Sequence, residues 1–169
     1  MPDDRADETA AAAKARRDRV FLVVVDDSPE RGVALRYAAL RTKKSGGRVA
    51  LLRVVEPAGQ VEWAGIGALM AEERREEAEK LLSTLAAEVN DITGGLPILL
   101  IREGEPRDEL LALLEEDPRI SILVLASSTD GSGPGPLIAA LTGRYAAKLP
   151  VPMTIVPGAL SDAELERVT

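Results

Sequence analysis

The chain has 169 residues, a length that suits one domain around a single core. Hydrophobic residues make up 46% of it while Phe, Trp and Tyr together supply 2%, so the core is expected to consist of aliphatic side chains. The net charge of −7 argues against a nucleic-acid partner, and the absence of Cys and His excludes cysteine nucleophiles, Ser-His-Asp triads and most zinc sites.

Residues 1–18 are polar and rich in alanine, with no apolar stripe that could face a core. We expect them to form a mobile N-terminal arm that is at most transiently helical. The arm lacks the apolar segment of a signal peptide, and no later apolar run approaches the ~20 residues of a membrane span. These features predict a cytoplasmic protein without a membrane partner.

The next segments have the pattern of a strand, a helix and a second strand. Residues 20–25 are a continuous apolar run of β-branched character, which is typical of a strand covered on both faces. Ser28 and Pro29 predict a helix start, with Ser28 as the N-cap and Pro29 at the first helical position. This helix is expected to end at Gly46, and residues 48–55 are expected to form the next strand.

The rest of the chain repeats this alternation. Residues 57–70 contain three glycines and no clear period, so we expect a loop there. The later elements are predicted as an amphipathic helix over 71–90, a strand over 96–102, a helix from Pro106, a strand over 120–126, a helix over 137–149, a strand over 151–156 and a short helix capped by Ser161. We expect this last helix to pack on a partner or to fray.

This element order predicts an α/β fold: an open five-stranded parallel sheet, doubly wound, with helices on both faces. The domain is expected to cover residues 19–157, and residues 158–169 are expected to form a C-terminal tail. Ligands of such sheets bind beyond the carboxyl ends of the strands. The loops that follow the strands are therefore the candidate sites.

Three segments resemble the universal stress protein family: VVVDDSPERGVALRYAALRTKKSGGRVALLRVVEP, GEPRDELL and LTGRYAAKLPVPMTIVP. The likeness covers residues 19–157 and implies a Rossmann-like fold related to adenine-nucleotide binding. In that family an Asp after the first strand and a Val in the second hold the nucleoside, and the matching positions are Asp26 and Val54. The residue types alone also allow structural roles, with Asp26 capping the following helix and Val54 buried in its strand.

The family's phosphate-binding segment, Gly-x-x-Gly-x9-Gly-Ser/Thr, matches this chain only in part. Gly133 and Gly143 have the nine-residue spacing, but Asp130 and Arg144 stand at the two remaining positions. Counted from the strand end instead, Ala126 takes the first position and the loop is four residues too long. The likeness therefore implies a degenerate ATP-binding loop.

The chemistry of this loop favours a rigid turn over a triphosphate site. Its two prolines lack backbone donors, and its aspartate repels phosphates unless a cation intervenes. A smaller nucleotide or another anion remains a candidate ligand. The groups that could contact its phosphate are the hydroxyls of Ser127 and Ser128, the backbone near Gly133 and Gly143, and the guanidinium of Arg144.

The resemblance implies a non-enzymatic stress-response regulatory protein that binds an adenine nucleotide, ATP or AMP, weakly or not at all, and requires no known cofactor. It also implies a homodimer through the edge strand near 151–156. An unpaired apolar edge strand is prone to aggregate unless another chain pairs with it. The alternative is an ATP-binding or ATP-hydrolysing α/β protein with an atypical phosphate loop. Ligases, nucleotidyl transferases and receiver domains fit poorly, since their histidine motifs, phosphate loops or acceptor aspartates have no counterpart.

Overall fold

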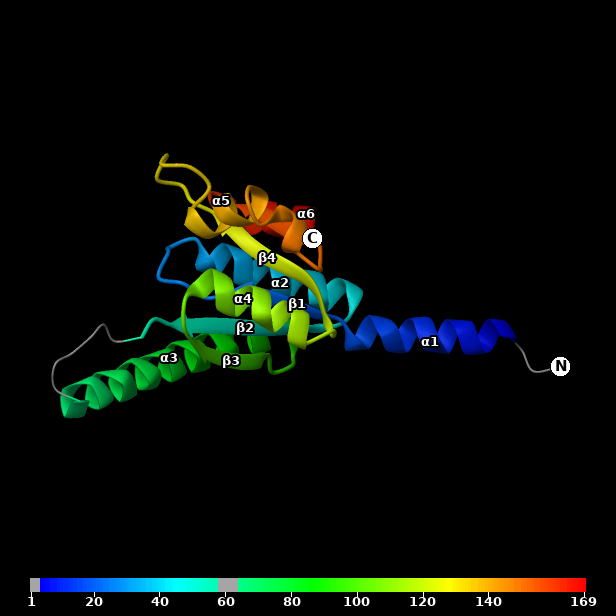
Figure 1. The fold of residues 1–169 in the computed structure, drawn as a ribbon. Helices are drawn as coiled ribbons and strands as arrows, with labels where there is room; N and C mark the ends of the chain where they lie inside the picture. The colour runs from blue at the N-terminus through cyan, green and yellow to red at the C-terminus, as the bar shows by residue number, and fades with distance from the viewer. Residues whose placement is uncertain (1–3, 58–63) are drawn as a thin grey trace.

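The structure is a computed structural model, and it describes residues 4–57 and 64–169. A single twisted sheet lies at its centre with helices on either side, and α1 extends away from the sheet (Figure 1). The elements in chain order are α1 (Asp4–Asp18), β1 (Val20–Val24), α2 (Arg31–Ser45), β2 (Arg48–Val55), α3 (Ala64–Thr93), β3 (Ile98–Glu103), α4 (Pro106–Glu116), β4 (Ile120–Ser127), α5 (Pro136–Thr142), the 3-10 helix η1 (Ala146–Lys148), β5 (Met153–Pro157) and α6 (Asp162–Val168).

The five strands are all parallel and lie in the order β3-β2-β1-β4-β5. The predicted doubly wound sheet is confirmed. The chain fills the sheet outward from β1 to β3 and then crosses back to add β4 and β5. The direction of winding therefore changes between β1 and β4, which makes the carboxyl ends of these strands the place where ligands of such folds bind.

Both faces of the central strand are covered, as its continuous apolar run predicts. Phe21 and Val23 belong to the core beneath α2, α3 and α6. Leu22 and Val24 belong to the core beneath α4 and α5. Because successive side chains of a strand point to opposite faces, this alternation places the two cores on the two sides of the sheet.

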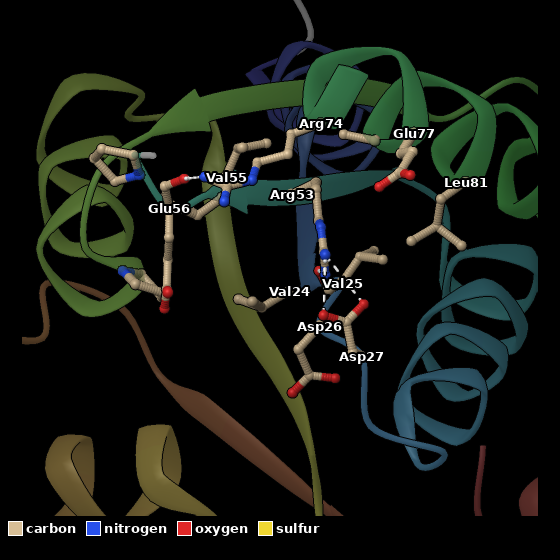
Figure 2. A pocket seen from close by; sticks show the side chains of 14 residues that line it. Val24, Val25, Asp26, Asp27, Arg53, Val55, Glu56, Arg74, Glu77 and Leu81 are labelled. Atoms are coloured by element: carbon tan, nitrogen blue, oxygen red, sulfur yellow. Dashed lines mark hydrogen bonds and ion pairs between the residues drawn. The ribbon is translucent and has the colours of Figure 1, made fainter. Parts of the chain in front are cut away.

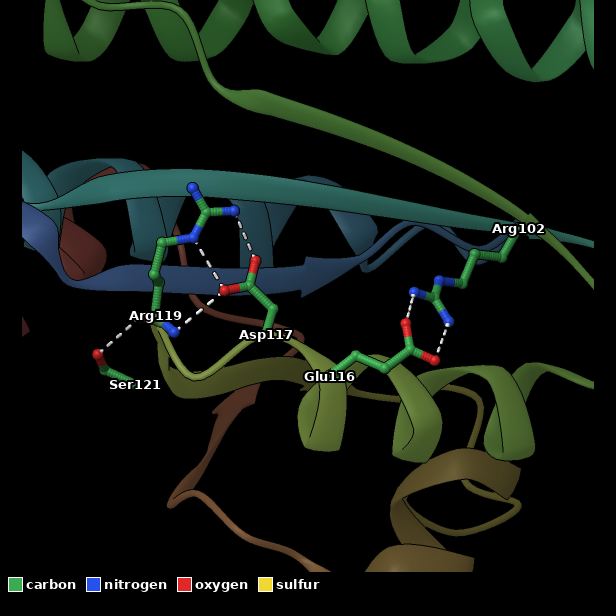
Figure 3. Close-up of polar contacts among 5 residues, drawn as sticks. All are labelled: Arg102, Glu116, Asp117, Arg119 and Ser121. Carbon is green, nitrogen blue, oxygen red and sulfur yellow. Dashed lines mark hydrogen bonds and ion pairs between the residues drawn. The ribbon is translucent and has the colours of Figure 1, made fainter.

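Ion pairs hold the C-terminal end of α4 between two strands (Figure 3). Arg102 of β3 forms a bidentate pair with Glu116. Asp117 accepts hydrogen bonds of 2.7–3.0 Å from the guanidinium and the backbone N–H of Arg119, at the start of β4. These arginine contacts hold the pKa of Glu116 and of Asp117 below the usual carboxyl range, so both acids are ionised at neutral pH.

The first helix of the domain starts two residues later than predicted, and Ser28 does not cap it. The N–H and Oγ of Ser28 donate to Oδ1 of Asp26, at 3.0 and 2.6 Å, so Ser28 belongs to a turn that precedes the helix. Residue Glu30 takes the N-cap position of α2. Asp26 accepts from both the N–H and the hydroxyl of Ser28 and so holds Ser28 in a local turn, which explains the wrong prediction.

The loop predicted over 57–70 is wrong for its second half, because α3 already begins at Ala64. Residues 58–63 lie outside the described residues. The first turns of α3 project beyond the sheet (Figure 1), where Ile66 and Leu69 are exposed. A helix without a core beside it needs no apolar stripe, so this segment shows no helical period.

The C-terminal elements also differ in extent from the prediction. The helix expected over 137–149 ends at Thr142, because Gly143 follows as its C-cap and only η1 continues it. The last helix, α6, packs on α2 of the same chain and buries Leu165. Among the described residues, no helix is both long and apolar enough to cross a membrane.

Candidate functional site

A pocket of about 570 Å³ opens at the carboxyl ends of β1 and β2, beneath α3 (Figure 2). Its walls combine backbone and side chains of both strand ends with one side of the helix. The lining residues are Val24, Val25, Asp26, Asp27, Arg53, Val54, Val55, Glu56, Pro57, Arg74, Glu77, Ala78, Leu81 and Pro106. A pocket of this size and position is typical of a small-molecule site in an α/β sheet.

Asp26 and Val54, which the sequence singles out from two distant segments, line this same pocket. Asp26 does have a structural role, although it is not the helix cap: its Oδ1 accepts both hydrogen bonds from Ser28. Its Oδ2 has no partner in the part of the chain that the structure describes. One oxygen of Asp26 thus shapes the turn, and the other is open to a ligand hydroxyl.

Arg53 is a pocket residue that the sequence analysis missed. Its guanidinium donates to the Val25 carbonyl oxygen and to the Asp27 carboxylate, both at 3.1 Å (Figure 2). Arg74, from α3, donates to the Glu56 carbonyl oxygen at 3.2 Å. The signal for Arg53 was its position inside the apolar run RVALLRVV, since a charged residue in a buried strand needs a partner.

The loop between β4 and α5 uses most of its backbone donors within the protein. The N–H groups of Ser128, Thr129, Asp130 and Ser132 all donate to acceptors of the chain. The two prolines carry no N–H. Only the glycine amides of this loop are therefore left for a ligand, in agreement with the prediction of a turn with few donors.

Glu30 holds this loop in place, and the sequence analysis assigned it no role. Its side chain is buried, and its Oε1 accepts from the Thr129 N–H at 2.9 Å and from the Thr129 Oγ1 at 2.5 Å. The hydroxyl first, and then the N–H, lower the pKa of Glu30 below the usual value, so the carboxylate is ionised at neutral pH. No short sequence signal marks it, because its partner is 99 residues away.

The remaining predicted loop residues lie away from the pocket. Ser127 Oγ accepts from the Gly158 N–H at 3.4 Å, beside the end of β5. Gly133 has a φ of +118°, which favours glycine in the turn. Gly143 ends α5, and its N–H donates to the Ala139 carbonyl oxygen. Arg144 is exposed, with its guanidinium 5.8 Å from the ring of Tyr145.

A second, smaller cavity of about 60 Å³ connects Asp26 with the start of α5. It lies at the change of winding direction between β1 and β4. Arg31 is the cation among its lining residues, which are Val24, Asp26, Ser28, Arg31, Ala34, Leu125, Ala126, Pro134, Gly135, Pro136, Leu137 and Ile138. Asp26 therefore borders both cavities. Within residues 4–57 and 64–169, no cluster of acidic side chains is arranged to hold a metal ion.

The comparisons with known proteins agree with this geometry. Residues 19–157 match the sequence model of the universal stress protein family. Among solved structures, the chain is similar to universal stress protein UspA from Lactobacillus plantarum, with 16% identity and a TM-score of 0.69 over 83% of this chain and 98% of that one. A search of curated proteins found no match.

Two further similar structures hold nucleotides. One is the universal stress protein from Archaeoglobus fulgidus in complex with dAMP, with 18% identity and a TM-score of 0.52 over 82% of this chain and 96% of that one. The other is a universal stress family protein from Arabidopsis thaliana with AMP bound, with 16% identity and a TM-score of 0.54 over 82% and 91%. At these identities the likeness establishes a shared fold.

Proposed function

Since the chain belongs to the universal stress protein family, we propose that it is a non-enzymatic, cytoplasmic stress-response protein that binds an adenine nucleoside or nucleotide beside β1 and β2. The observation that carries the proposal is that Asp26 and Val54 line one pocket of about 570 Å³. The relatives named with AMP and dAMP support the adenine class.

The pocket supplies the contacts that a nucleoside needs. The free Oδ2 of Asp26 can accept a hydrogen bond from a ribose hydroxyl, and the half-buried Val54 offers an apolar surface and backbone groups to a base. Ser127, Ser128, Gly133, Gly143 and Arg144 stay candidate phosphate contacts, secondary to these two because they line neither cavity. The occupied donors of the loop count against the ATP-hydrolysing alternative.

We also propose that two chains associate through β5. This strand pairs only with β4, so its other edge is free within the described chain, and the Ile155 side chain is 40% exposed. An unpaired apolar edge favours pairing with another strand, and a second copy offers the same edge. Residues 19–157 would then contain both the ligand site and the dimer contact.

Calorimetric titration with adenosine and AMP tests the nucleotide proposal. We expect both ligands to bind the wild-type protein and Asp26→Ala to weaken them at least tenfold. Asp26→Asn keeps the acceptor for Ser28 but loses the second carboxylate oxygen, so it should lose affinity while the turn stays intact. The control is Asp91→Ala, at an exposed position near the far end of α3.

Two results would overturn the proposal. One is a wild-type protein that binds neither adenosine nor AMP. The other is an Asp26→Asn variant that binds adenosine as tightly as wild type, because the open oxygen of Asp26 would then have no part in the site.

A further inference from the structure

We infer that the site is built for a nucleoside monophosphate, and that Glu30 excludes a triphosphate by occupying the loop in which a longer phosphate chain would lie. This inference rests on the proposed adenine-nucleotide function and names its ligand class. It depends on three observations: the contacts of Glu30, the small cavity beside Asp26, and the charges around that cavity.

The Glu30 carboxylate already occupies hydrogen-bond donors that a bound anion would need in the loop after β4. Backbone N–H groups of loops and helix N-termini, together with hydroxyls, commonly bind phosphates. In this chain the Thr129 N–H and Oγ1 both donate to Oε1 of Glu30, which is 5% exposed. Any phosphate oxygen that needs these donors must first displace a buried, hydrogen-bonded carboxylate.

The small cavity offers a place for one phosphoryl group next to Asp26. Its volume is about 60 Å³, and a phosphoryl group that enters it would lie beside Arg31 and the Pro134–Pro136 turn. Because Asp26 lines both this cavity and the larger pocket, a ligand held at Asp26 can reach both. The cavity ends at the Pro134–Pro136 turn, where two of the three residues have no N–H.

The charges around the cavity favour one phosphate and oppose a longer chain. Arg31 lines the cavity, and its Nη1 donates to the Ser28 carbonyl oxygen at 3.1 Å, which leaves its other N–H groups for an anion. Two carboxylates contact the loop after β4 itself: Glu30 accepts from Thr129, and Asp130 accepts from Ser132. Hydrogen bonds from Thr129 and from Ser132, respectively, lower the pKa of each, so both repel further phosphates at neutral pH.

The test compares adenosine, AMP and ATP by calorimetric titration, with and without Mg²⁺. For wild type we expect AMP to bind at least tenfold more tightly than ATP. Glu30→Gln keeps a side-chain carbonyl for Thr129 but removes the charge, so ATP should gain about tenfold while AMP changes less than threefold. Arg31→Gln should weaken AMP towards the affinity of adenosine. Glu88→Gln, the same change at an exposed position on α3, is the control.

The outcomes separate the two proposals. If neither adenosine nor AMP binds, the proposed function fails. If adenosine binds but wild type holds ATP as tightly as AMP, the function stands and the inference fails, and this result requires no variant. An Arg31→Gln variant that binds AMP like wild type also contradicts the inference. Circular dichroism and thermal unfolding of Glu30→Gln establish that it is folded before its titration is compared.

Discussion

Glu30, Ser127 and Gly158 bring three segments of the chain together at one point. The aliphatic part of Glu30 lies against Gly158, and the Gly158 N–H donates to Ser127 Oγ. A Cβ added at Gly158 would overlap the Ser127 carbonyl oxygen and lie 2.5 Å from Cγ of Glu30. The position therefore requires glycine for lack of space, not for its backbone angles.

Gly158→Ala is expected to destabilise the protein by about 1–3 kcal/mol, because a backbone oxygen and a buried side chain must move to admit one methyl group. Urea unfolding monitored by circular dichroism measures this change. Gly32→Ala is the matched control, since no atom lies within 4 Å of its added Cβ and alanine favours the helix by about 0.5–1 kcal/mol. Equal stabilities of the two variants would show that the Gly158 contact is unimportant.

Among single residues, the sequence pointed only to those candidate pocket residues that lie in or next to a recognisable strand. Asp26 and Val54 directly follow or belong to apolar strands, and the structure places them at one pocket. Glu30 could not be found, because its role depends on Thr129, which is distant in sequence. Arg53 could have been found, since only a paired arginine is tolerated in such a strand.

The last helix, α6, is an integral part of the domain surface. Ser161 and Glu164 form a reciprocal capping box at its start. On α2, Arg36 forms a 3.0 Å ion pair with Asp162, and Lys44 donates to the Glu166 carbonyl oxygen at 2.9 Å. These polar contacts surround one buried side chain, Leu165, which fixes the helix against the core.

Leu165→Ala is expected to cost about 2–5 kcal/mol, because it removes a side chain that is 1% exposed and leaves a cavity. Val168→Ala is the control on the same helix, since Val168 is exposed and should change stability by less than about 0.5 kcal/mol. Denaturant unfolding of both variants gives the comparison. If Leu165→Ala were as mild as its control, α6 would not contribute to the core.

Element types were predictable wherever a core imposes a pattern, and their boundaries were not. The second strand follows its apolar run residue for residue, over Arg48–Val55. Errors arose where local chemistry or solvent replaces the core. One is at Ser28, which Asp26 holds in a turn, and the other is in the first turns of α3, where Ile66 and Leu69 are exposed. The tail could not be placed because only Leu160 and Leu165 of it pack on the core, too few to give a helical period.

For the whole molecule, the proposed dimer predicts a clear difference between the two edges of the sheet. We expect wild type to sediment as a dimer and Ile155→Asp, on the β5 edge, to sediment as a monomer. The control is Leu96→Asp, which places the same charge at an exposed leucine just before the opposite edge strand, β3. This variant should stay dimeric. A wild-type monomer would contradict the β5 proposal.

The contact between Gly158 and Glu30 also links the two proposals, for the ligand site and for the dimer. Gly158 directly follows β5, and Glu30 holds the loop beside the small cavity, so the proposed subunit edge and the proposed ligand site share one packed contact. Coupling between two binding events is reciprocal. If a ligand changes the dissociation constant of the dimer by some factor, dimerisation must therefore change the affinity for that ligand by the same factor. Sedimentation of wild type with and without AMP gives this factor as the ratio of the two dimer dissociation constants.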